Sequence, residues 1–514
     1  MKLIQKLGVI LFIIGMAVFT IMPFLGSYQL SEQIVLTNTK EIHQEKMREI
    51  LAPMYGKSYN SNFAFLSELN NYFNTYNDKL KSESKWEEVI WDDYSFSIAK
   101  AAIDSPVREF PMLFFALSIG LAVLGGVFYI LPKHREEPPG VKNNGIFHSS
   151  MKNRGWMGIV TGTYLILFYI ILYWFPAYIV NPVWMVNPIS LLLSGNPASQ
   201  WFLYGAIYTI AILVMGIRMF RKYRGNRYQQ LRTASVMFFQ TSFAFLIPEI
   251  LVLLNQPYFD FKNIWPLDYD FFYDYQIDTF LSAGGVGMFM LIWGILLIII
   301  AVPLFTYFYG KRWYCSWVCG CGGLAETLGD PYRQLSDKSL KAWKYERVIV
   351  HSVLVLAVVM TLITIINYFS GFELLGNVTN QLHSFYGFAI GSAFAGVIGT
   401  GFYPFMGNRV WCRFGCPLAA YLGIVQRFKS RFRITTNGGQ CISCGNCSTY
   451  CEMGIDVRWY AQRGQEVVRA SCVGCGVCSS VCPRGVLKLE NGPAENRINE
   501  MPIIIGNDSI KVNA

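Results

Sequence analysis

Long apolar stretches alternate with short polar ones over most of the chain. Eight of the apolar stretches are long enough to cross a bilayer as helices, which takes about 20 residues each. They lie near residues 5–26, 110–132, 156–180, 201–219, 233–254, 284–309, 348–369 and 385–406. The pattern therefore predicts an all-α polytopic membrane bundle with about eight transmembrane helices.

The first apolar stretch follows the basic residues Lys2 and Lys6. The apolar core of a secretory signal also follows basic residues. The stretch is long for such a core, and no A-x-A cleavage pattern follows it. We therefore expect residues 1–26 to be a retained transmembrane anchor.

Composition agrees with a membrane protein, because 53% of the 514 residues are hydrophobic and 15% are charged. The net charge of +10 would also suit nucleic-acid binding. However, the basic residues lie in short loops between apolar stretches, and no basic groove with interleaved aromatic residues accompanies them. We therefore expect membrane lipid around the chain and no nucleic-acid partner.

The same basic residues predict the orientation of the chain. They gather in the second and fourth loops of the bundle, at Lys133, Arg135, Lys142, Lys152 and Arg154 and at Arg218, Arg221, Lys222, Arg224, Arg227 and Arg232. The opposite loops are acidic or neutral, with Asp260, Asp268, Asp270 and Asp274 in one of them. The positive-inside rule places both termini in the cytoplasm, for a protein of the cell inner (cytoplasmic) membrane. Residues 27–109 then form a polar, largely helical extracytoplasmic segment without a recognisable functional motif.

All 13 cysteines fall between Cys315 and Cys482, and each belongs to a short-spaced motif. A secreted disulfide framework would place its cysteines at longer intervals. Grouped thiols on the reducing side of a membrane indicate metal ligation instead.

Two runs with the spacing C-x2-C-x2-C-x3-C lie in the cytoplasmic region 408–514, the first at Cys441, Cys444, Cys447 and Cys451 and the second at Cys472, Cys475, Cys478 and Cys482. In two-cluster ferredoxins the fourth cysteine of each run binds the other cluster. On this logic one [4Fe–4S] cluster is held by Cys441, Cys444, Cys447 and Cys482, and the other by Cys472, Cys475, Cys478 and Cys451. The region is therefore predicted to be a ferredoxin-like α+β domain.

Glycines within these runs, Gly445, Gly474 and Gly476, let the backbone approach the inorganic sulfides. A pair of zinc sites is the alternative, but it leaves the third and fourth cysteines of each run unexplained. Pro483 follows the second run, whereas Glu452 follows the first. We expect this departure to alter the turn and the potential of one cluster, and not the ligation.

A second cysteine pattern occurs twice in the predicted transmembrane core, residues 110–407, and at its border with the tail domain. The pattern G-x-R-x-aromatic-C-x-aromatic-x-C runs from Gly310 through Cys315 to Cys319, and again from Gly407 through Cys412 to Cys416. The likeness continues into Leu324-Ala-Glu-Thr-Leu-Gly and Leu418-Ala-Ala-Tyr-Leu-Gly once three extra residues are allowed in the first copy. Both copies follow a span that runs inward, as in parallel repeats.

Cysteines four apart on a helix lie on one face with Cβ atoms about 5–6 Å apart, too far for a disulfide within one copy. Two such hairpins facing each other would offer Cys315, Cys319, Cys412 and Cys416 to a metal or a third cluster. Cys321 leaves the ligand set open. The alternative is that these thiols are merely small buried residues.

These motifs resemble the membrane polyferredoxins of the NosR/NapH group over roughly residues 200–490, and the membrane core of NosR in particular. That resemblance implies quinol-linked electron transfer to a respiratory reductase across the membrane, including that for nitrous oxide. Two departures stand out, because Gly320 replaces the proline of the first hairpin and the N-terminal segment is far shorter than the flavin-binding domain of NosR. No flavin-attachment motif occurs, so covalent FMN is not expected.

Ionisable residues in the spans supply candidates for proton chemistry. Glu249 follows Pro248 in an apolar stretch and either accepts a proton from quinol or hydrogen-bonds a kinked helix. His351 either hydrogen-bonds a quinone near the hairpins or packs as a structural histidine. It is the one histidine within a predicted span, and no C-x2-C-H occurs, so haem is not expected.

Three functions remain open. The first is a quinol dehydrogenase or electron-transfer subunit that passes electrons among quinone, the hairpins and the two clusters, for anaerobic respiration. The second is an assembly factor that reduces a metal or a thiol during maturation of a respiratory enzyme. A purely structural anchor, the third, does not explain so many grouped thiols.

Overall fold

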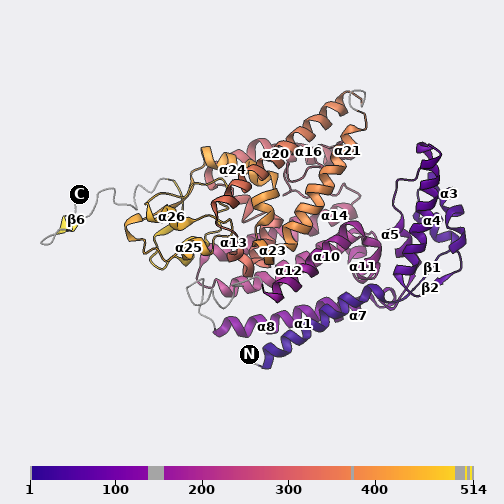
Figure 1. Ribbon diagram of the computed structural model, residues 1–514, viewed down its shortest axis with the longest axis horizontal. Coiled ribbons are helices and arrows are strands. Elements are labelled where there is room, and N and C mark those ends of the chain that lie inside the picture. Colours follow the sequence, from indigo (N-terminus) through magenta and orange to yellow (C-terminus); the bar gives the residue numbers. More distant parts are fainter. Residues whose placement is uncertain (1–2, 137–154, 372–375, 493–503, 506–509, 512–514) are drawn as a thin grey trace. The chain divides into compact units, whose positions relative to one another are not determined.

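A computed structural model describes residues 3–136, 155–371, 376–492, 504–505 and 510–511 (Figure 1). Three of the basic loop residues that predict the orientation, Lys142, Lys152 and Arg154, lie outside these residues. The chain forms two compact units, one of Met1–Glu137, Tyr164–Arg218 and Phe245–Phe259 and another of Pro138–Thr163, Met219–Ala244 and Asp260–Ala514. All 13 cysteines belong to the second unit.

Nine helical stretches within the described residues are long and apolar enough to cross a membrane, which agrees with a polytopic bundle. They are Leu3–Phe24, Pro111–Lys133, Trp156–Trp174, Pro176–Ser194, Gln200–Lys222, Arg227–Leu253, Gly284–Tyr309, Leu340–Phe369 and Val378–Gly401. The protein is therefore a mostly helical, multi-pass membrane protein.

The stretch Pro176–Ser194 was not among the eight predicted spans. It consists of a short 3₁₀ turn and helix α11 (Val180–Ser194), and its Asn181 and Asn187 lower the hydropathy that the prediction used. Within the first unit α11 packs against α5 (Ser95–Ala102) and α6 (Pro106–Glu109). Asn181 is fully buried and donates to the carbonyls of Met22 and Leu25 at 2.9 and 2.8 Å.

Helices α1 (Leu3–Ile21) and α8 (Leu121–Glu136) lie side by side in the first unit (Figure 1). Small residues make this close packing feasible, as in many membrane helix pairs. A Cβ atom on Gly8 would lie 2.7 Å from the carbonyl oxygen of Gly125, and one on Gly15 would lie 2.5 Å from that of Ser118.

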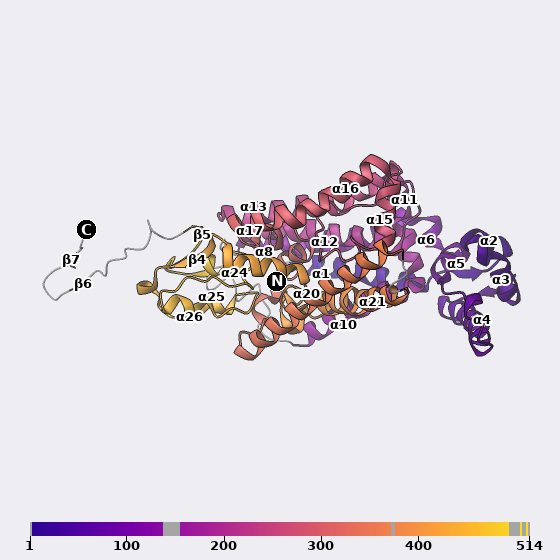
Figure 2. The ribbon, with the colours of Figure 1, turned by 90° about the horizontal axis from the view of Figure 1, so that it is seen from above.

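The polar segment 27–109 is a small folded region whose buried apolar residues form one cluster with Ala177 and Val180. It contains the expected helices, α2 (Glu32–Asn38), α3 (Glu41–Leu51), α4 (Asn62–Ser82) and α5, which appear together in Figure 2. It also contains an antiparallel sheet that was not predicted, in the order β2 (Ser58–Tyr59), β1 (Ser27–Gln29) and β3 (Ile103–Asp104). Very short strands of this kind carry too little alternation to be read from sequence.

The tail of the second unit has the predicted ferredoxin-like α+β fold. Strands β4 (Phe432–Thr436) and β5 (Leu487–Asn491) pair antiparallel, with Ile434 opposite Leu489. The short helices α25 (Asn446–Thr449) and α26 (Val457–Gln462) lie near this sheet (Figure 2), and α27 (Val477–Val481) packs against β5. The first cysteine run therefore extends across α25, and the second extends across α27.

Candidate iron–sulfur centres

The first predicted ligand set of the tail is gathered in one place. Cys441, Cys444, Cys447 and Cys482 line the same small cavity, although Cys482 comes from the other cysteine run. Gly445 begins α25 with a φ of 77°, a conformation that glycine adopts without strain. Cys444 is exposed and Cys447 is buried, so this site lies close to the protein surface.

The second predicted set is gathered around Cys478. This thiol interacts electrostatically with Cys475, Cys472 and Cys451, the last of which comes from the first run. Gly476 begins α27 with a φ of 77°, and burial raises the pKa of the Cys472 thiol to about 11. Because a thiolate is the ligating form, such buried thiols need the positive charge of a bound metal group to ionise.

The grouping of the tail cysteines favours clusters over single zinc ions. Cys482 lies with the first run and Cys451 with the second, as in two-cluster ferredoxins. A pair of zinc sites would leave the third and fourth cysteines of each run unexplained. Among the described residues, the group of three or more ligating atoms within 4.8 Å of one another is Glu326, Glu452 and Cys475.

The first hairpin of the membrane edge follows α17 (Val302–Tyr309). Gly310 ends that helix with a φ of 65°, and the one-turn helix α18 (Arg312–Cys315) carries the first thiol. Cys319 has an extended backbone, with φ −64° and ψ 135°, and caps α19 (Gly320–Thr327).

The second hairpin repeats this arrangement. Gly407 ends α23 (Tyr403–Met406) with a φ of 91°, and the π-helical turn η10 (Trp411–Gly415) carries Cys412. Cys416 is extended, with φ −79° and ψ 111°, and its Sγ atom accepts a hydrogen bond from the amide of Ala419 at the start of α24 (Pro417–Lys429).

The two cysteines of each pair therefore do not lie on one continuous helix, and the Cβ spacing of a helix does not apply to them. The helical backbone breaks at Cys319 and at Cys416, and each of these residues begins the next helix instead. In the second copy Pro417 explains the break, because a proline disfavours helical backbone at the residue before it. In the first copy Gly320 occupies the equivalent position and the backbone breaks in the same way.

The structure nevertheless brings the two hairpins together. Cys416 interacts electrostatically with Cys412, Cys319 and Cys315, and all four thiols are buried. Cys321 is partly exposed and hydrogen-bonds Cys319. The cysteines of both copies thus converge within the second unit, and Cys321 lies among them.

The surroundings of the hairpin thiols suit an anionic metal group. Burial raises the pKa of Cys315 to about 12, and the charges of Lys311 and Arg409 act in the opposite direction. The indole Nε1 of Trp411, next to Cys412, is buried without a hydrogen-bond partner among the described residues. Cations beside the buried thiols are the environment that stabilises a thiolate-bound group.

A buried group of charged side chains lies between the hairpins and the tail, and the sequence analysis did not predict it. Glu326 of α19 pairs with Arg232 at 2.7 Å, with Arg333 at 3.0 Å and with Arg409 at 2.6 Å. Although desolvation opposes ionisation, these three guanidinium groups hold the pKa of Glu326 well below its ordinary value. Glu326 and Arg409 lie inside the repeated pattern, so the repeat itself could have indicated them.

Glu452 belongs to the same group. Its carboxylate pairs with Arg333 at 2.7 Å and with Arg409 at 3.1 Å, and its side chain is fully buried. These ion pairs explain why a glutamate, and not a proline, follows the first cysteine run, because a proline would supply no charge. We therefore define Arg232, Glu326, Arg333, Arg409 and Glu452 as the buried charge network.

The other two candidate residues, Glu249 and His351, belong to different units. Glu249 is in α14 (Ile247–Leu253) of the first unit, where it hydrogen-bonds Ser194. His351 is in α20 (Leu340–Phe369) and lines a cavity with Cys412. Both alternatives for Glu249 therefore stay open.

The expectation of a single histidine within a span is wrong, because α21 (Val378–Tyr386) begins earlier than predicted and includes His383. The Nε2 atom of His383 lies 2.6 Å from Asp270. His351 is 18 residues from the end of α20, which corresponds to about 27 Å. His351 therefore lies in the first half of α20, and His383 lies within α21.

Comparison with known proteins agrees with this geometry. Residues 291–339 and 387–435 each match the 4Fe-4S binding domain family, so both copies of the repeat resemble the same family. Residues 412–487 match the 4Fe-4S dicluster domain family, which covers all eight tail cysteines.

The chain is similar to YccM of Escherichia coli (strain K12), which is named as an electron transport protein. The chain is 27% identical to it over 159 residues, which is 29% of this chain and 43% of YccM. The chain thus spans less than half the length of this relative. No solved structure matches the chain. Together with the thiols and spans, these likenesses indicate a membrane-associated iron–sulfur electron-transfer protein.

Proposed function

We propose that the protein oxidises membrane quinol and passes the electrons through iron–sulfur centres toward a respiratory reductase across the membrane. In this proposal the tail thiols hold two [4Fe–4S] clusters in the cytoplasm, and the hairpin thiols hold a third centre at the edge of the inner membrane. The resemblance to NosR extends the proposal to a reductase for nitrous oxide.

A cavity beside the second hairpin carries this proposal. It has a volume of about 500 Å³, within the range of small-molecule sites, and it lies in the second unit at the first turns of α20. Its walls include Cys412 and Arg413 of the hairpin, Trp343 and His351 of α20, and Lys311 and Tyr460. A redox-active head group bound there would lie next to a hairpin thiol and to the start of a membrane span.

The hydrogen bonding of His351 suits a quinol ligand. Its Nδ1 atom lies 2.6 Å from the carbonyl oxygen of Arg347. Since a carbonyl only accepts hydrogen bonds, Nδ1 is the donor in this contact, which leaves Nε2 as the ring atom that can accept one. The hydroxyl group of a quinol could donate a hydrogen bond to Nε2.

The oxidation of one quinol to quinone releases two electrons and two protons. Each [4Fe–4S] cluster takes up one electron at a time, so the two electrons enter the centres one after the other. His351 is the proposed acceptor of the first proton, and the second proton passes to solvent.

A larger cavity of about 770 Å³ lies beside the first hairpin and is lined by Tyr228, Phe239, Trp313, Trp317 and Gly476, among other residues. Its lining contains no cysteine. We therefore place the quinol in the cavity of Cys412 and His351, and the larger cavity provides a control.

The test is the rate at which a short-chain quinol analogue reduces the clusters in the anaerobic purified protein. His351→Gln should slow this rate at least about tenfold with unchanged iron content, whereas Phe239→Ala should leave it unchanged. An unchanged rate in His351→Gln would contradict the proposed site. A loss in Phe239→Ala alone would move the quinol to the larger cavity.

The alternative function, reduction of a metal or a thiol during assembly of a respiratory enzyme, is favoured by the many buried thiols. If the protein has this function, the chemically reduced protein should reduce the metal or the thiol in the absence of quinol. If the quinol analogue reduces no cluster in the wild-type protein and a metal ion reoxidises the reduced clusters, the assembly function replaces quinol oxidation.

A further inference from the structure

Two buried arginines donate hydrogen bonds to cysteine sulfurs of different centres. The Nη1 atom of Arg333 lies 3.9 Å from Sγ of Cys475, a predicted ligand of the second tail cluster. The Nη1 atom of Arg409 lies 3.7 Å from Sγ of Cys412 in the second hairpin. Both arginines are almost fully buried.

We propose that Arg333 and Arg409 are redox-tuning residues that raise the reduction potentials of the second tail cluster and of the hairpin centre, and that Glu326 and Glu452 join them into one electrostatic unit. This inference is independent of the substrate that supplies the electrons, because it concerns the clusters themselves.

The position of Arg333 is fixed on several sides. Its Nη1 atom donates to Glu452 at 2.7 Å, and its Nη2 atom donates to Glu326 at 3.0 Å and to Asp330 at 3.4 Å. The guanidinium group therefore cannot turn away from Cys475 without breaking buried ion pairs. Arg232 adds a second cation at this cluster loop, since its Nη1 atom donates to the carbonyl of Cys475 at 2.9 Å.

Arg409 is held in the same way at the hairpins. Its Nη2 atom donates to Glu326 at 2.6 Å and lies 3.1 Å from Glu452, while its Nη1 atom donates to the carbonyl of Cys315 at 3.1 Å. One guanidinium group thus contacts both copies of the repeat, at Cys315 and at Cys412.

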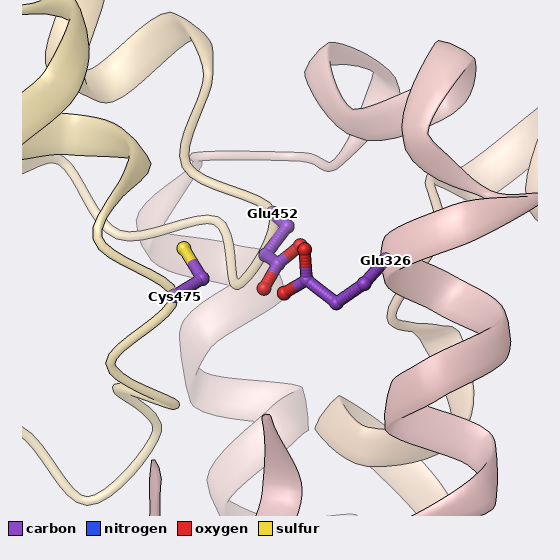
Figure 3. Close-up of side chains that lie close together, drawn as sticks. All are labelled: Glu326, Glu452 and Cys475. Atoms are coloured by element: carbon purple, nitrogen blue, oxygen red, sulfur yellow. The ribbon is translucent and has the colours of Figure 1, made fainter. Parts of the chain in front are cut away.

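The two carboxylates connect the arginines of the two centres. Figure 3 shows the carboxylate groups of Glu326 and Glu452 facing each other beside Cys475. Their ligand atoms and that of Cys475 lie within 4.8 Å of one another, a spacing that a metal ion could use. The three arginines already pair with these oxygens and bring three positive charges, so the group is an ion-pair network and not a cation site.

The sign of the effect follows from charge. Three arginines and two glutamates leave the buried charge network with a net charge of +1, and Asp330 is paired with Lys222 at 2.8 Å. Reduction adds a negative charge to a cluster. Cations and hydrogen bonds to the ligating sulfurs stabilise that added charge, and they therefore raise the potential.

Potentiometric titration of the two tail clusters, followed by EPR, tests the proposal in the intact protein. Arg333→Gln should lower the potential of one cluster and reduce its one-electron reduction constant at least about tenfold, equivalent to 59 mV. The cluster of Cys441, Cys444, Cys447 and Cys482 is the internal reference and should shift far less. Arg333→Lys keeps the charge without the planar fork and should give a smaller shift.

Two further variants separate tuning from loosening of the fold. Glu452→Gln removes a negative charge and should raise the same potential, opposite in sign to Arg333→Gln. Arg433→Gln removes a partly exposed cation that pairs with Glu466 at 2.9 Å, and it should move neither potential. With iron content equal to wild type, an unmoved potential in Arg333→Gln overturns the proposal. A downward shift in Glu452→Gln also overturns it.

Discussion

Arg333 and Glu452 form an ion pair of 2.7 Å in which both side chains are buried. Glu452 directly follows Cys451, the last cysteine of the first run, whereas Arg333 lies in the 3₁₀ turn η8 (Asp330–Leu335) after the first hairpin. The pair therefore fixes a loop of the tail domain to the region of the membrane edge. The hydroxyl of Ser336 strengthens this attachment by donating to the carbonyl of Glu452 at 2.7 Å.

The buried charge network should be needed for stability. Glu326→Gln removes the charge that three arginines share, and it should lower the free energy of unfolding by about 3–5 kcal/mol. The matched variant Glu466→Gln removes the partner of Arg433 near the surface and should cost less than about 1 kcal/mol. Thermal unfolding of both variants in the same detergent gives the comparison, and equal losses would contradict a special role for Glu326.

A glycine of the second cysteine run should be required by close packing. Gly474 and Gly485 have nearly the same φ, 61° and 64°. A Cβ atom on Gly474 would lie 2.6 Å from Cβ of Arg312, but one on Gly485 would meet nothing within 4 Å. Gly485→Ala should therefore cost only about 1–2 kcal/mol of backbone strain.

Gly474→Ala adds the steric clash to the same strain, so it should also lose one cluster. Iron content and the EPR signal of the two variants measure the difference. Full cluster content in Gly474→Ala would show that this loop is free to move away from Arg312.

One acidic side chain outside the spans should make stability depend on pH. Asp268 lies in the loop between α14 and α15 (Asp274–Ser282), where burial, together with Asp270 and Asp260, raises its pKa to about 7 from 3.8. Between these two values the folded protein binds the proton more tightly than the unfolded chain. Stability should therefore fall as the pH rises from about 4 to 7, and this group should add no further change above that range.

Asp268→Asn is the control for this prediction. The amide cannot ionise, so the fall in unfolding temperature between pH 4 and pH 7 should become smaller than in the wild-type protein. An identical pH profile in the variant would contradict the raised pKa of Asp268.

The tail ligand sets predict the result of removing one thiol. Cys478→Ala removes a ligand of the second cluster and should remove about four irons and most electron transfer. The spin–spin interaction between the two reduced clusters should disappear from the EPR spectrum. An unchanged spectrum would contradict the proposed ligands.

Much of this architecture could be predicted from the sequence because its signals are local. Apolar length gives the spans, and the spacing of Cys441 to Cys451 and of Cys472 to Cys482 gives the ferredoxin-like fold. Helix α11 was missed because Asn181 and Asn187 interrupt its apolar pattern, although buried partners satisfy Asn181. The break at Cys416 could have been predicted from Pro417.

The buried charge network could not be predicted in the same way. Arg333 has no distinguishing neighbours in the sequence, and its partner Glu452 lies 119 residues further along the chain. Such pairs depend on the tertiary fold. The repeat did mark Arg409 and Glu326, but a motif cannot tell whether an arginine is buried at a thiol, as Arg409 is, or stacked on Phe432, as Arg312 is.

Iron and acid-labile sulfide per chain, measured on anaerobically purified protein, test the proposed centres most directly. Two tail clusters and a hairpin cluster predict about twelve irons, and the double variant Cys412→Ala and Cys416→Ala should retain about eight. About eight irons in the wild-type protein would contradict a cluster at the hairpins. Fewer than eight, with no EPR signal from interacting clusters, would contradict the two-cluster tail itself.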